Sequence, residues 1–577
     1  MSPERRGLVA AARGAAELDL VIRGARVLNV YTLELRRADI GILGERIAVV
    51  DDGGRLALEG TRVLEAHDLI ATPGFVDTHV HIESSFVTPD GFARGVLPFG
   101  TTAVVIDPHE ICNVLGLQGF QYMLRASAEL PLRVYLTVPS SVPAVPHLES
   151  AGARFEAAEV AELLGHDRVV GVAELMDYPG VIAGRERTTA IVEAGLRSGK
   201  ALEGHAPLVT GRDLAAYLAA GVDADHECRS AEEMVEKLRA GMWVYARENT
   251  FRHTGPFLAE ALREVPHAWN AALCTDDTDP ADLLEHGHLN RGVRALIAGG
   301  VEPALAYRIA TLNGATRFGL RDLGALGAGR YADVLLLEDL RDPTPRLVIA
   351  RGQVAARDGA ICPERFPAPV PPPSGNTVRL GALTEDDFTL RSPQANATTP
   401  VIEIDAVRTT RLGAVALEFA DGKLLGPLPD DVLLLSVVPR HGQAHRPSLA
   451  LLRGLSLQRG ALATTVAHDS HNLIVAGKTP RDLLDAVLEV QRLGGGAVLV
   501  ADGAVLATLR LEVAGLISAR PIEEVAVEVR DFNRAARRLG LDGPSPVLAI
   551  SSLALPVAPF YRLTDLGLVD TLTQRFV

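Results

Sequence analysis

The chain has 577 residues, 47% of them hydrophobic and 54 of them glycine, and this length predicts about three or four globular domains. Its net charge of −15 at pH 7 excludes sequence-independent nucleic-acid binding, because such binding depends on an excess of Lys and Arg. No apolar run approaches the ~20 residues of a membrane-spanning helix, and four cysteines without C-x-x-C spacing exclude a cysteine-based zinc site and favour a reducing cytoplasm.

Two strand-rich stretches lie far apart in the sequence. Residues 18–50 alternate apolar and polar residues, with Gly24 and the pair Gly44-Glu45 where hairpin turns are expected. Residues 333–359 show the same strand pattern. Neither stretch has enough strands for a stable sheet, so we predict that residues 1–71 and 328–365 form one composite β-sandwich. The first 17 residues lack the apolar stretch of a signal peptide.

Between these stretches, residues 72–327 alternate strand and helix patterns. Eight apolar runs end at polar residues, namely HVH (79–81), DPHE (107–110), PSS (139–141), ELMD (174–177), EGH (203–205), DHE (225–227), YARE (245–248) and TDD (275–277). Helical patterns follow most of them, for example over residues 211–220 and 230–240. Polar residues at so many strand ends predict a (β/α)₈ barrel with an α/β fold, since an open doubly wound sheet binds its ligands in one crevice.

The remaining chain is predicted to begin with a linker. Residues 366–376 are proline-rich and can neither pair in a central strand nor continue a helix. Residues 377–577 are then expected to form a separate C-terminal αβ domain. This domain should contain a core strand at Val432–Val438, a helix over 479–493, a glycine break at 494–496 and a strand over 497–509.

Six residues at the predicted strand ends are candidate metal ligands: His79, His81, Glu174, His205, His226 and Asp276. Residues i and i+2 of a strand point to the same side, so His79 and His81 project together. Imidazole and carboxylate ligands suit two divalent ions such as Mn²⁺, Fe²⁺, Zn²⁺ or Co²⁺. Two such ions can share a hydroxide and make it a nucleophile near neutral pH.

Several of these residues have a structural alternative. The two histidines of HVH could simply face solvent at a strand end, His205 could cap a helix, and His226 could pair with Asp225 at the surface. Asp276 is expected both to bind a metal and to accept the proton of the hydroxide. Asp277 is expected to be unable to replace it, because the next residue of a strand points to the opposite face.

The combined motifs resemble a known family. They are PGFVDTHVHIESS from Pro73, DPHEI from Asp107, AELMDYPGV from Ala173, GHAP from Gly204, DHE from Asp225 and CTDD from Cys274. Together they resemble the amidohydrolase superfamily and, within it, the bacterial adenine deaminase branch. HDSHN at 468–472 resembles the C-terminal domain of that branch, so the resemblance covers nearly the whole chain.

The resemblance implies a ligand arrangement. His79, His81 and Asp276 would hold the first metal, and His205 and His226 the second. Many relatives bridge their metals with a carboxylated lysine on the fourth strand. This strand has no lysine here, so Glu174 would be the bridge, as in the adenine deaminases. Residues 247–250 (RENT) depart from the usual Arg-Glu-Gly-Ser of relatives.

The resemblance also implies the reaction, in which adenine and water give hypoxanthine and ammonia. A hydroxide that bridges two ions, with Mn²⁺ or Fe²⁺ preferred, would attack C6, and Asp276 would pass its proton to the leaving amine. Glu110 or His109 would protonate N1, although a glutamate at a helix N-terminus also has a structural explanation. The expected partner is a small molecule, without nucleic acid or membrane, and the chain is expected to be a cytoplasmic homodimer or higher homo-oligomer.

Five further residues are candidates for substrate contact or for a lid: Glu83, Ser84, His468, Asp469 and His471. The last three could instead hold an accessory metal or order a domain interface. Two other functions compete with deamination. One is hydrolysis of a cyclic amide on the same scaffold, against which the missing lysine and the C-terminal domain argue. The other is a non-catalytic binding protein, which would have lost some of the six ligands.

Overall fold

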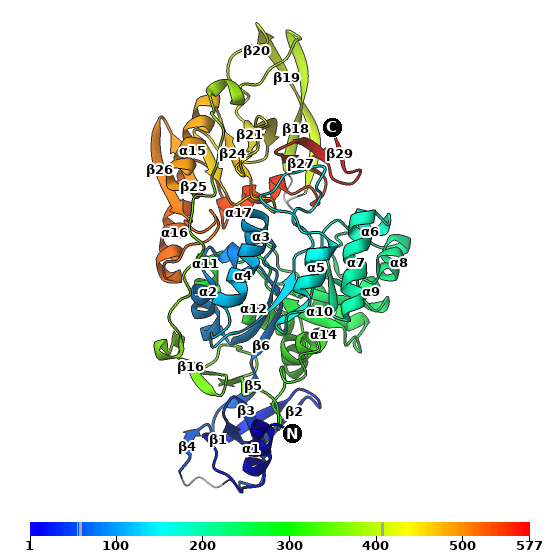
Figure 1. Cartoon of the computed structure of the whole chain (residues 1–577), viewed down its shortest axis with the longest axis vertical. Coiled ribbons are helices and arrows are strands. Elements are labelled where there is room, and N and C mark those ends of the chain that lie inside the picture. Colours follow the sequence, from blue (N-terminus) through cyan, green and yellow to red (C-terminus); the bar gives the residue numbers. More distant parts are fainter. Residues whose placement is uncertain (55, 57–59, 405–408) are drawn as a thin grey trace.

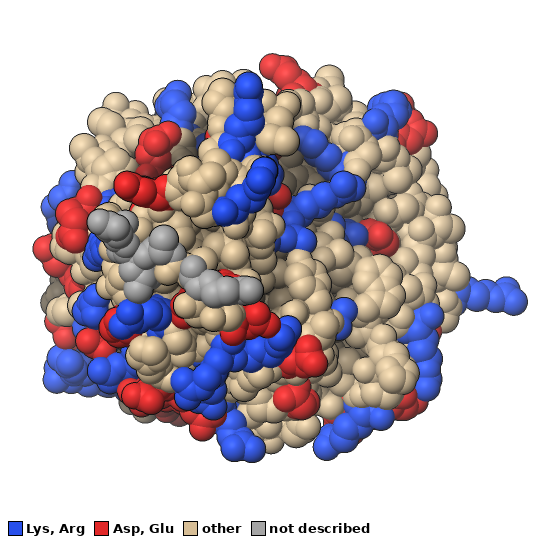
Figure 2. All heavy atoms as spheres, turned by 90° about the horizontal axis from the view of Figure 1, so that it is seen from below, with Lys and Arg blue, Asp and Glu red and all other residues tan. Residues whose placement is uncertain are grey.

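The computed structural model describes residues 1–54, 56, 60–404 and 409–577, and the chain is elongated (Figure 1). A sheet that contains the N-terminal strands lies at one end, a curled parallel sheet surrounded by helices lies in the middle, and a second large sheet lies at the other end (Figure 1). None of the helices in these residues is long and apolar enough to cross a bilayer. On the face seen from below, acidic and basic side chains are interspersed (Figure 2).

The first sheet joins the two strand-rich stretches of the sequence. Its order is β17-β16-β15-β14-β5-β1-β2-β3, with β4 beside β1, and β5 pairs with both β14 and β1. A helix, α1 (Pro3–Ala12), precedes it. The strands are β1 (Leu20–Asn29), β2 (Glu34–Leu43), β3 (Arg46–Asp51), β4 (Arg62–Glu65), β5 (Ile70–Pro73), β14 (Val334–Leu337), β15 (Leu347–Ala350), β16 (Gln353–Arg357) and β17 (Ala360–Ile361).

Of the two predicted hairpin turns, one is confirmed and one is wrong. Gly44 and Glu45 connect β2 to β3 directly after the pair Leu43 and Arg46. Gly24 instead lies inside β1, where the register shifts between Ile22 and Ala25. Its φ of 75° and the close approach of the His67 ring, 2.1 Å from where a Cβ would be, suit a β-bulge that only glycine can occupy.

The middle of the chain contains the eight predicted strand ends. Strands β6 to β10 form one parallel sheet and β11 to β13 another. A parallel bridge between Val80 and Asp276 places β6 beside the end of β13, so the sheet curls on itself. The strands are β6 (Phe75–Val80), β7 (Thr101–Ile106), β8 (Arg133–Val138), β9 (Val169–Leu175), β10 (Ala201–Gly204), β11 (Ala224–Asp225), β12 (Trp243–Arg247) and β13 (Ala271–Cys274).

Helices follow these strands and cover the outside of the curled sheet (Figure 1). Ser230 illustrates how they begin, since its side chain accepts from Glu233 N at 3.2 Å and caps α9. The helices are α2 (Pro89–Val96), α3 (His109–Leu115), α4 (Leu117–Ala126), α5 (Ala157–Leu163), α6 (Tyr178–Ile182), α7 (Glu186–Ser198), α8 (Gly211–Ala220), α9 (Ala231–Arg239), α10 (Gly255–Glu264), α11 (Pro280–His286), α12 (Asn290–Ala298), α13 (Pro303–Arg308) and α14 (Gly314–Arg317).

The second large sheet has the order β20-β19-β18-β22-β21-β24-β23-β25-β26. These strands are β18 (Asn396–Ile404), β19 (Thr410–Ala420), β20 (Lys423–Leu424), β21 (Val432–Val438), β22 (Ser448–Arg453), β23 (Ala461–Thr464), β24 (Leu473–Gly477), β25 (Gly496–Ala501) and β26 (Ala504–Arg510). The helices are α15 (Pro480–Leu493), α16 (Ile522–Arg538) and α17 (Pro546–Ser551), and a small sheet of β27 (Tyr561–Thr564), β28 (Gly567–Asp570) and β29 (Arg575–Phe576) ends the chain.

The predicted single strand over 497–509 is wrong. Asp502 and Gly503 divide it into β25 and β26, which pair as a hairpin. Their φ angles of 54° and 74° are typical of the two-residue turn that an Asp-Gly pair forms. The core strand β21 and the helix α15 lie where they were predicted, and residues 366–376 contain neither helix nor strand.

Candidate active site

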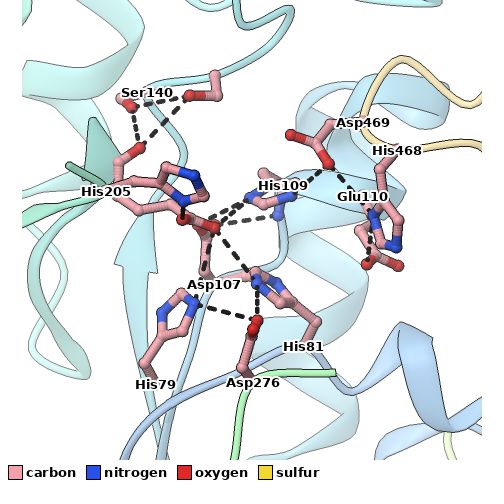
Figure 3. Close-up of polar contacts among 12 residues, drawn as sticks. His79, His81, Asp107, His109, Glu110, Ser140, His205, Asp276, His468 and Asp469 are labelled. Carbon is pink, nitrogen blue, oxygen red and sulfur yellow. Dashed lines mark hydrogen bonds and ion pairs between the residues drawn. The ribbon is translucent and has the colours of Figure 1, made fainter. Parts of the chain in front are cut away.

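The six predicted ligands come together in one buried cluster. Figure 3 shows His79, His81, His205 and Asp276 pointing toward one another from the strand ends. Each of the six is at most 6% exposed. They are His79 in β6, His81 directly after it, Glu174 in β9, His205 after β10, His226 after β11 and Asp276 after β13.

Glu174 lies at the centre of this cluster, with one pair of histidines on each of its oxygens. Its Oε1 is 3.6 Å from His79 Nε2 and 3.3 Å from His81 Nε2. Its Oε2 is 2.6 Å from His205 Nδ1 and 3.3 Å from His226 Nε2. Burial would raise the pKa of Glu174, but the imidazoles, His79 foremost, hold it well below its ordinary value. The carboxylate is therefore ionised and faces two separate donor pairs.

Asp276 faces the histidine pair on one side and an arginine on the other. Its Oδ1 is 3.2 Å from His81 Nε2 and 3.7 Å from His79 Nε2. Its Oδ2 accepts from Arg247, whose Nη1 is also 2.6 Å from Glu227. Burial would raise the pKa of Asp276, but Arg247 and the imidazoles hold it well below its ordinary value. Sequence reasoning gave Arg247 no role, although it ends the seventh strand.

The expectation that Asp277 points away from the site is wrong. Asp276 follows the end of β13 and has a φ of 58°, so strand alternation no longer applies there. Asp277 lines the same cavity as Asp276, and its Oδ1 is 2.6 Å from Ser84 Oγ.

The predicted proton donors lie beside the cluster. His109 Nδ1 is 2.8 Å from Asp107 Oδ2 and 3.7 Å from Glu174 Oε1. Its Nε2 is 3.4 Å from Asp469 Oδ1, in a segment that reaches in from the C-terminal part of the chain (Figure 3). Burial would lower the pKa of His109, but Asp107 and Asp469 raise it well above its ordinary value. His109 thus lies between two carboxylates that favour its charged form.

Glu110 belongs to a second polar group. Ser84 Oγ lies 3.0 Å from Glu110 Oε1 and 2.6 Å from Asp277 Oδ1. The Ser84 hydroxyl therefore links the two carboxyl groups and can donate to either. Burial raises the pKa of Glu110, which favours its protonated form. Glu83 is also buried, its Oε1 accepts from Ile111 N, and burial raises its pKa to about 8.

The segment 468–472 approaches this group. His468 Nδ1 is 3.4 Å from Glu110 Oε1 and 3.2 Å from Asp469 Oδ1. His471 Nδ1 accepts from Ala467 N at 3.2 Å, which places the hydrogen of the neutral imidazole on Nε2. This nitrogen is buried without a hydrogen-bond partner among the described residues, and the ligand atoms of Glu110, His468 and His471 lie within 4.8 Å of one another, so the accessory metal site stays a prediction.

A cavity of about 120 Å³ lies over the cluster. His109, Asp276 and Asp277 line it together with four arginines, Arg229, Arg247, Arg252 and Arg562. Leu555, Ala558 and Pro559 close it from the C-terminal part of the chain. The sequence analysis did not predict the four arginines or the three C-terminal residues of this cavity. The C-terminal residues belong to no recognisable motif, and the arginines resemble ordinary surface residues in the sequence.

Metal ions fit the cluster. His79 Nε2 is buried and has no hydrogen-bond partner among the described residues, although two carboxylate oxygens lie less than 4 Å away. The ligand atoms of His79, His226 and Asp276 lie within 4.8 Å of one another, as do those of Glu174, His205 and His226, and those of His81, Asp107, His109 and Glu174. Burial and the charge of His226 lower the pKa of His79, which favours the neutral form that a metal requires.

Comparison with known proteins agrees with this architecture. Residues 70–355 match the amidohydrolase family, so the middle of the chain defines an amidohydrolase. Residues 408–575 match the adenine deaminase C-terminal domain. The chain belongs to the adenine deaminase family.

Relatives of similar length support this placement. The chain is 42% identical to "Adenine deaminase" of Nitratidesulfovibrio vulgaris (strain DP4), over 99% of this chain and 98% of the relative. It is 40% identical to "Adenine deaminase" of Methanothrix thermoacetophila, over 98% and 97% of the two chains. It is 42% identical to "Adenine deaminase 2" of Rhizobium meliloti (strain 1021), over 99% and 95%.

Proposed function

We propose that the protein is a hydrolase that converts adenine and water to hypoxanthine and ammonia. The observation that carries the proposal is Glu174, whose two oxygens each face a separate pair of buried histidines. The full-length similarity to proteins named adenine deaminase supplies the substrate. In the reaction a C6–O bond forms, the C6–N bond breaks, and the amino group leaves as ammonia.

Two divalent ions would be held by the predicted ligands. His79, His81 and Asp276 would bind one ion, His205 and His226 the other, and Glu174 would bridge them; the geometry also places His109 beside this group. Such ions lower the pKa of water enough to supply a nucleophile near neutral pH. Mn²⁺ or Fe²⁺ remains our preference, because imidazole and carboxylate ligands without thiolates suit these ions.

Asp276 would accept the proton of the attacking water and deliver it to the leaving amine. Its Oδ1 faces the histidine pair, and Arg247 contacts its Oδ2, so the side chain is held from both sides. Buried beside the proposed metal ligands and favoured in its ionised form, it would act as the base.

Of the two candidates for protonating N1, the structure favours His109. His109 lines the cavity, and Asp107 and Asp469 raise its pKa, whereas Glu110 contacts Ser84 and His468 and is not among the described residues that line the cavity. Asp469 would hold His109 Nε2 in position, and Glu110 would act through its neighbours.

The C-terminal residues would close the site over the purine. His468 and Asp469 reach the proton donors, and Leu555, Ala558 and Pro559 give one cavity wall an apolar surface suited to a flat ring. Glu83, Ser84 and His471 would support these groups. We accordingly propose that residues 72–327 form a closed (β/α)₈ barrel inserted in a composite β-sandwich of residues 1–71 and 328–365, with 377–577 as the closing domain after the linker 366–376.

The deciding experiment measures the loss of adenine absorbance together with ammonia release by the metal-loaded protein. Equal amounts of hypoxanthine and ammonia are expected. Turnover of adenosine without turnover of adenine would contradict the substrate. Hydrolytic opening of a cyclic amide, with adenine left unchanged, would assign the competing hydrolase activity. The cytoplasmic location and the homo-oligomeric state stay predictions from the sequence.

A further inference from the structure

The wall of the cavity carries two arginines that the proposed reaction does not use. Arg229 follows β11, and Arg252 lies in the loop between β12 and α10. Both line the cavity and are half-buried. Neither guanidinium group has an ion-pair or hydrogen-bond partner within the part of the chain that the structure describes, and Arg229 Nε is buried without one. A half-buried guanidinium without a partner loses hydration and gains nothing in return.

The other charges of this wall do not neutralise the two arginines. Glu227 acts on both of them, but it is 2.6 Å from Arg247 Nη1 and is therefore already paired. Burial lowers the pKa of Arg252 in spite of Glu227, and the charges of Arg247 and Arg229 lower it further. Arg229 and Arg252 thus face two carboxylates, Glu227 and Asp276, that both already pair with Arg247.

Backbone hydrogen bonds fix the segments that carry both arginines. Asn249 Oδ1 accepts from Phe251 N at 2.9 Å and from Arg252 N at 2.8 Å, which closes the loop after β12. Arg229 N donates to Glu233 Oε2 at 2.9 Å. Donors whose backbone is already ordered lose less entropy when they bind a ligand.

We propose that Arg229 and Arg252 form a binding site for an oxyanion, a phosphate or carboxylate group, at the wall of the cavity. Guanidinium groups bind such anions through paired, charge-assisted hydrogen bonds. The inference rests on the proposed function in one respect. Adenine is neutral, so the proposed substrate would not compensate the charges of these two guanidinium groups. The anion can arrive as free phosphate or as the phosphate of a purine nucleotide.

The test measures binding of inorganic phosphate to the metal-loaded protein, from the rise in Tm at constant ionic strength with chloride as the reference. Arg229→Gln and Arg252→Gln should each weaken phosphate binding about tenfold, because each removes a charge-assisted contact. Arg263→Gln, on the exposed face of α10, removes the same charge and should leave phosphate binding unchanged. Equal phosphate affinity in the wild type and in both cavity variants would overturn the proposal, since the anion would then bind elsewhere, for example to the metals.

A second measurement guards against a structural role of the arginines. Without phosphate, Arg229→Gln and Arg252→Gln should melt no lower than the wild type, because each removes an uncompensated charge. A marked fall in Tm would show that the guanidinium group is needed for folding and would overturn the proposal.

The source of the anion follows from comparing AMP with adenosine. If AMP binds more tightly than adenosine and the two arginine variants abolish the difference, the site accepts the phosphate of a nucleotide. If AMP binds no more tightly than adenosine while phosphate binding depends on the arginines, the site accepts a free oxyanion. If neither phosphate nor AMP responds to the arginines, there is no oxyanion site. These are binding measurements, so their failure is distinguishable from a failure of adenine deamination.

Discussion

Two buried clusters of ionisable groups meet at the end of β11, and they differ in how their hydrogen bonds are satisfied. Asp225 belongs to the first, in which Lys237 Nζ donates to Asp225 Oδ2 at 2.9 Å, to Glu233 Oε1 at 2.6 Å and to Ala206 O at 2.7 Å. The next residue, His226, belongs to the second, around Glu174. All three hydrogens of Lys237 have acceptors, whereas His79 Nε2 has no partner in the described structure.

The difference separates a structural cluster from a binding site. A buried lysine with three acceptors needs nothing further, so the first cluster is complete in the protein alone. The second cluster contains more buried imidazole and carboxylate groups than the hydrogen bonds among them can satisfy. Such an arrangement is costly without a ligand, and for this reason we assign the metals to it.

The largest effect is expected from Asp276→Asn. The change removes a metal ligand and the proposed proton acceptor together, so kcat for adenine should fall by about 10²–10⁴. Asp277→Asn is the matched control, because Asp277 lines the same cavity but contacts Ser84, and it should lose much less. Similar losses in both variants would mean that the two aspartates share the role.

The second prediction concerns the first, structural cluster, from which Lys237→Met removes the only cation named there. This change leaves Asp225 and Glu233 buried without their cation, and the free energy of unfolding should fall by about 3–5 kcal/mol. Thermal unfolding measures the loss. Lys237→Met combined with Glu233→Gln should recover part of it, because one uncompensated carboxylate is removed. Unchanged stability of the single variant would refute the structural role of Lys237.

Glu174→Gln tests the proposed bridge between the two metal ions. An amide offers one neutral acceptor instead of a charged bridge, so metal binding should weaken by about 100-fold or more, with little change in the fold. Elemental analysis should find about two ions per chain in the wild type and at most one in the variant. Full metal content with normal turnover in this variant would mean that another group bridges the ions.

The smallest effect concerns Glu149, a buried carboxyl group that belongs to neither cluster. Burial raises its pKa to about 8, and its Oε1 accepts from Val145 N. In the unfolded chain it ionises near its ordinary pKa, so between about pH 5 and 8 the folded state holds one more proton and stability falls as pH rises. Glu149→Gln should remove this fall.

The expected gain at pH 8 is about 1–2 kcal/mol, since the amide keeps the acceptor for Val145 but adds a buried donor. Melting temperatures measured from pH 5 to 8 would show it as a flatter profile than that of the wild type. Glu186→Gln, at an exposed position on α7, should leave the profile unchanged. Parallel profiles for wild type and Glu149→Gln would contradict the raised pKa.

The sequence by itself determined the strand ends and the identity of the six central residues. Strand alternation placed His79 and His81 on one side, and parallel strands bring their carboxyl ends to the same edge, so local periodicity was sufficient. It selected His226 as a ligand but gave Asp225 only a possible surface pair with His226, whereas Asp225 accepts from the buried Lys237. Asp277 was misjudged because its backbone leaves the strand conformation at Asp276, which no local pattern announces.

Only the tertiary structure decided which distant groups complete the site. Asp469 reaches His109 across hundreds of residues, and Arg229, Arg252 and Leu555 line one cavity although no motif contains them all. Whether a charge is compensated depends on every neighbour in space, and a sequence lists neighbours in only one dimension. The local pattern therefore specifies which residues can do chemistry, and the packing of distant segments specifies which of them still lack a partner.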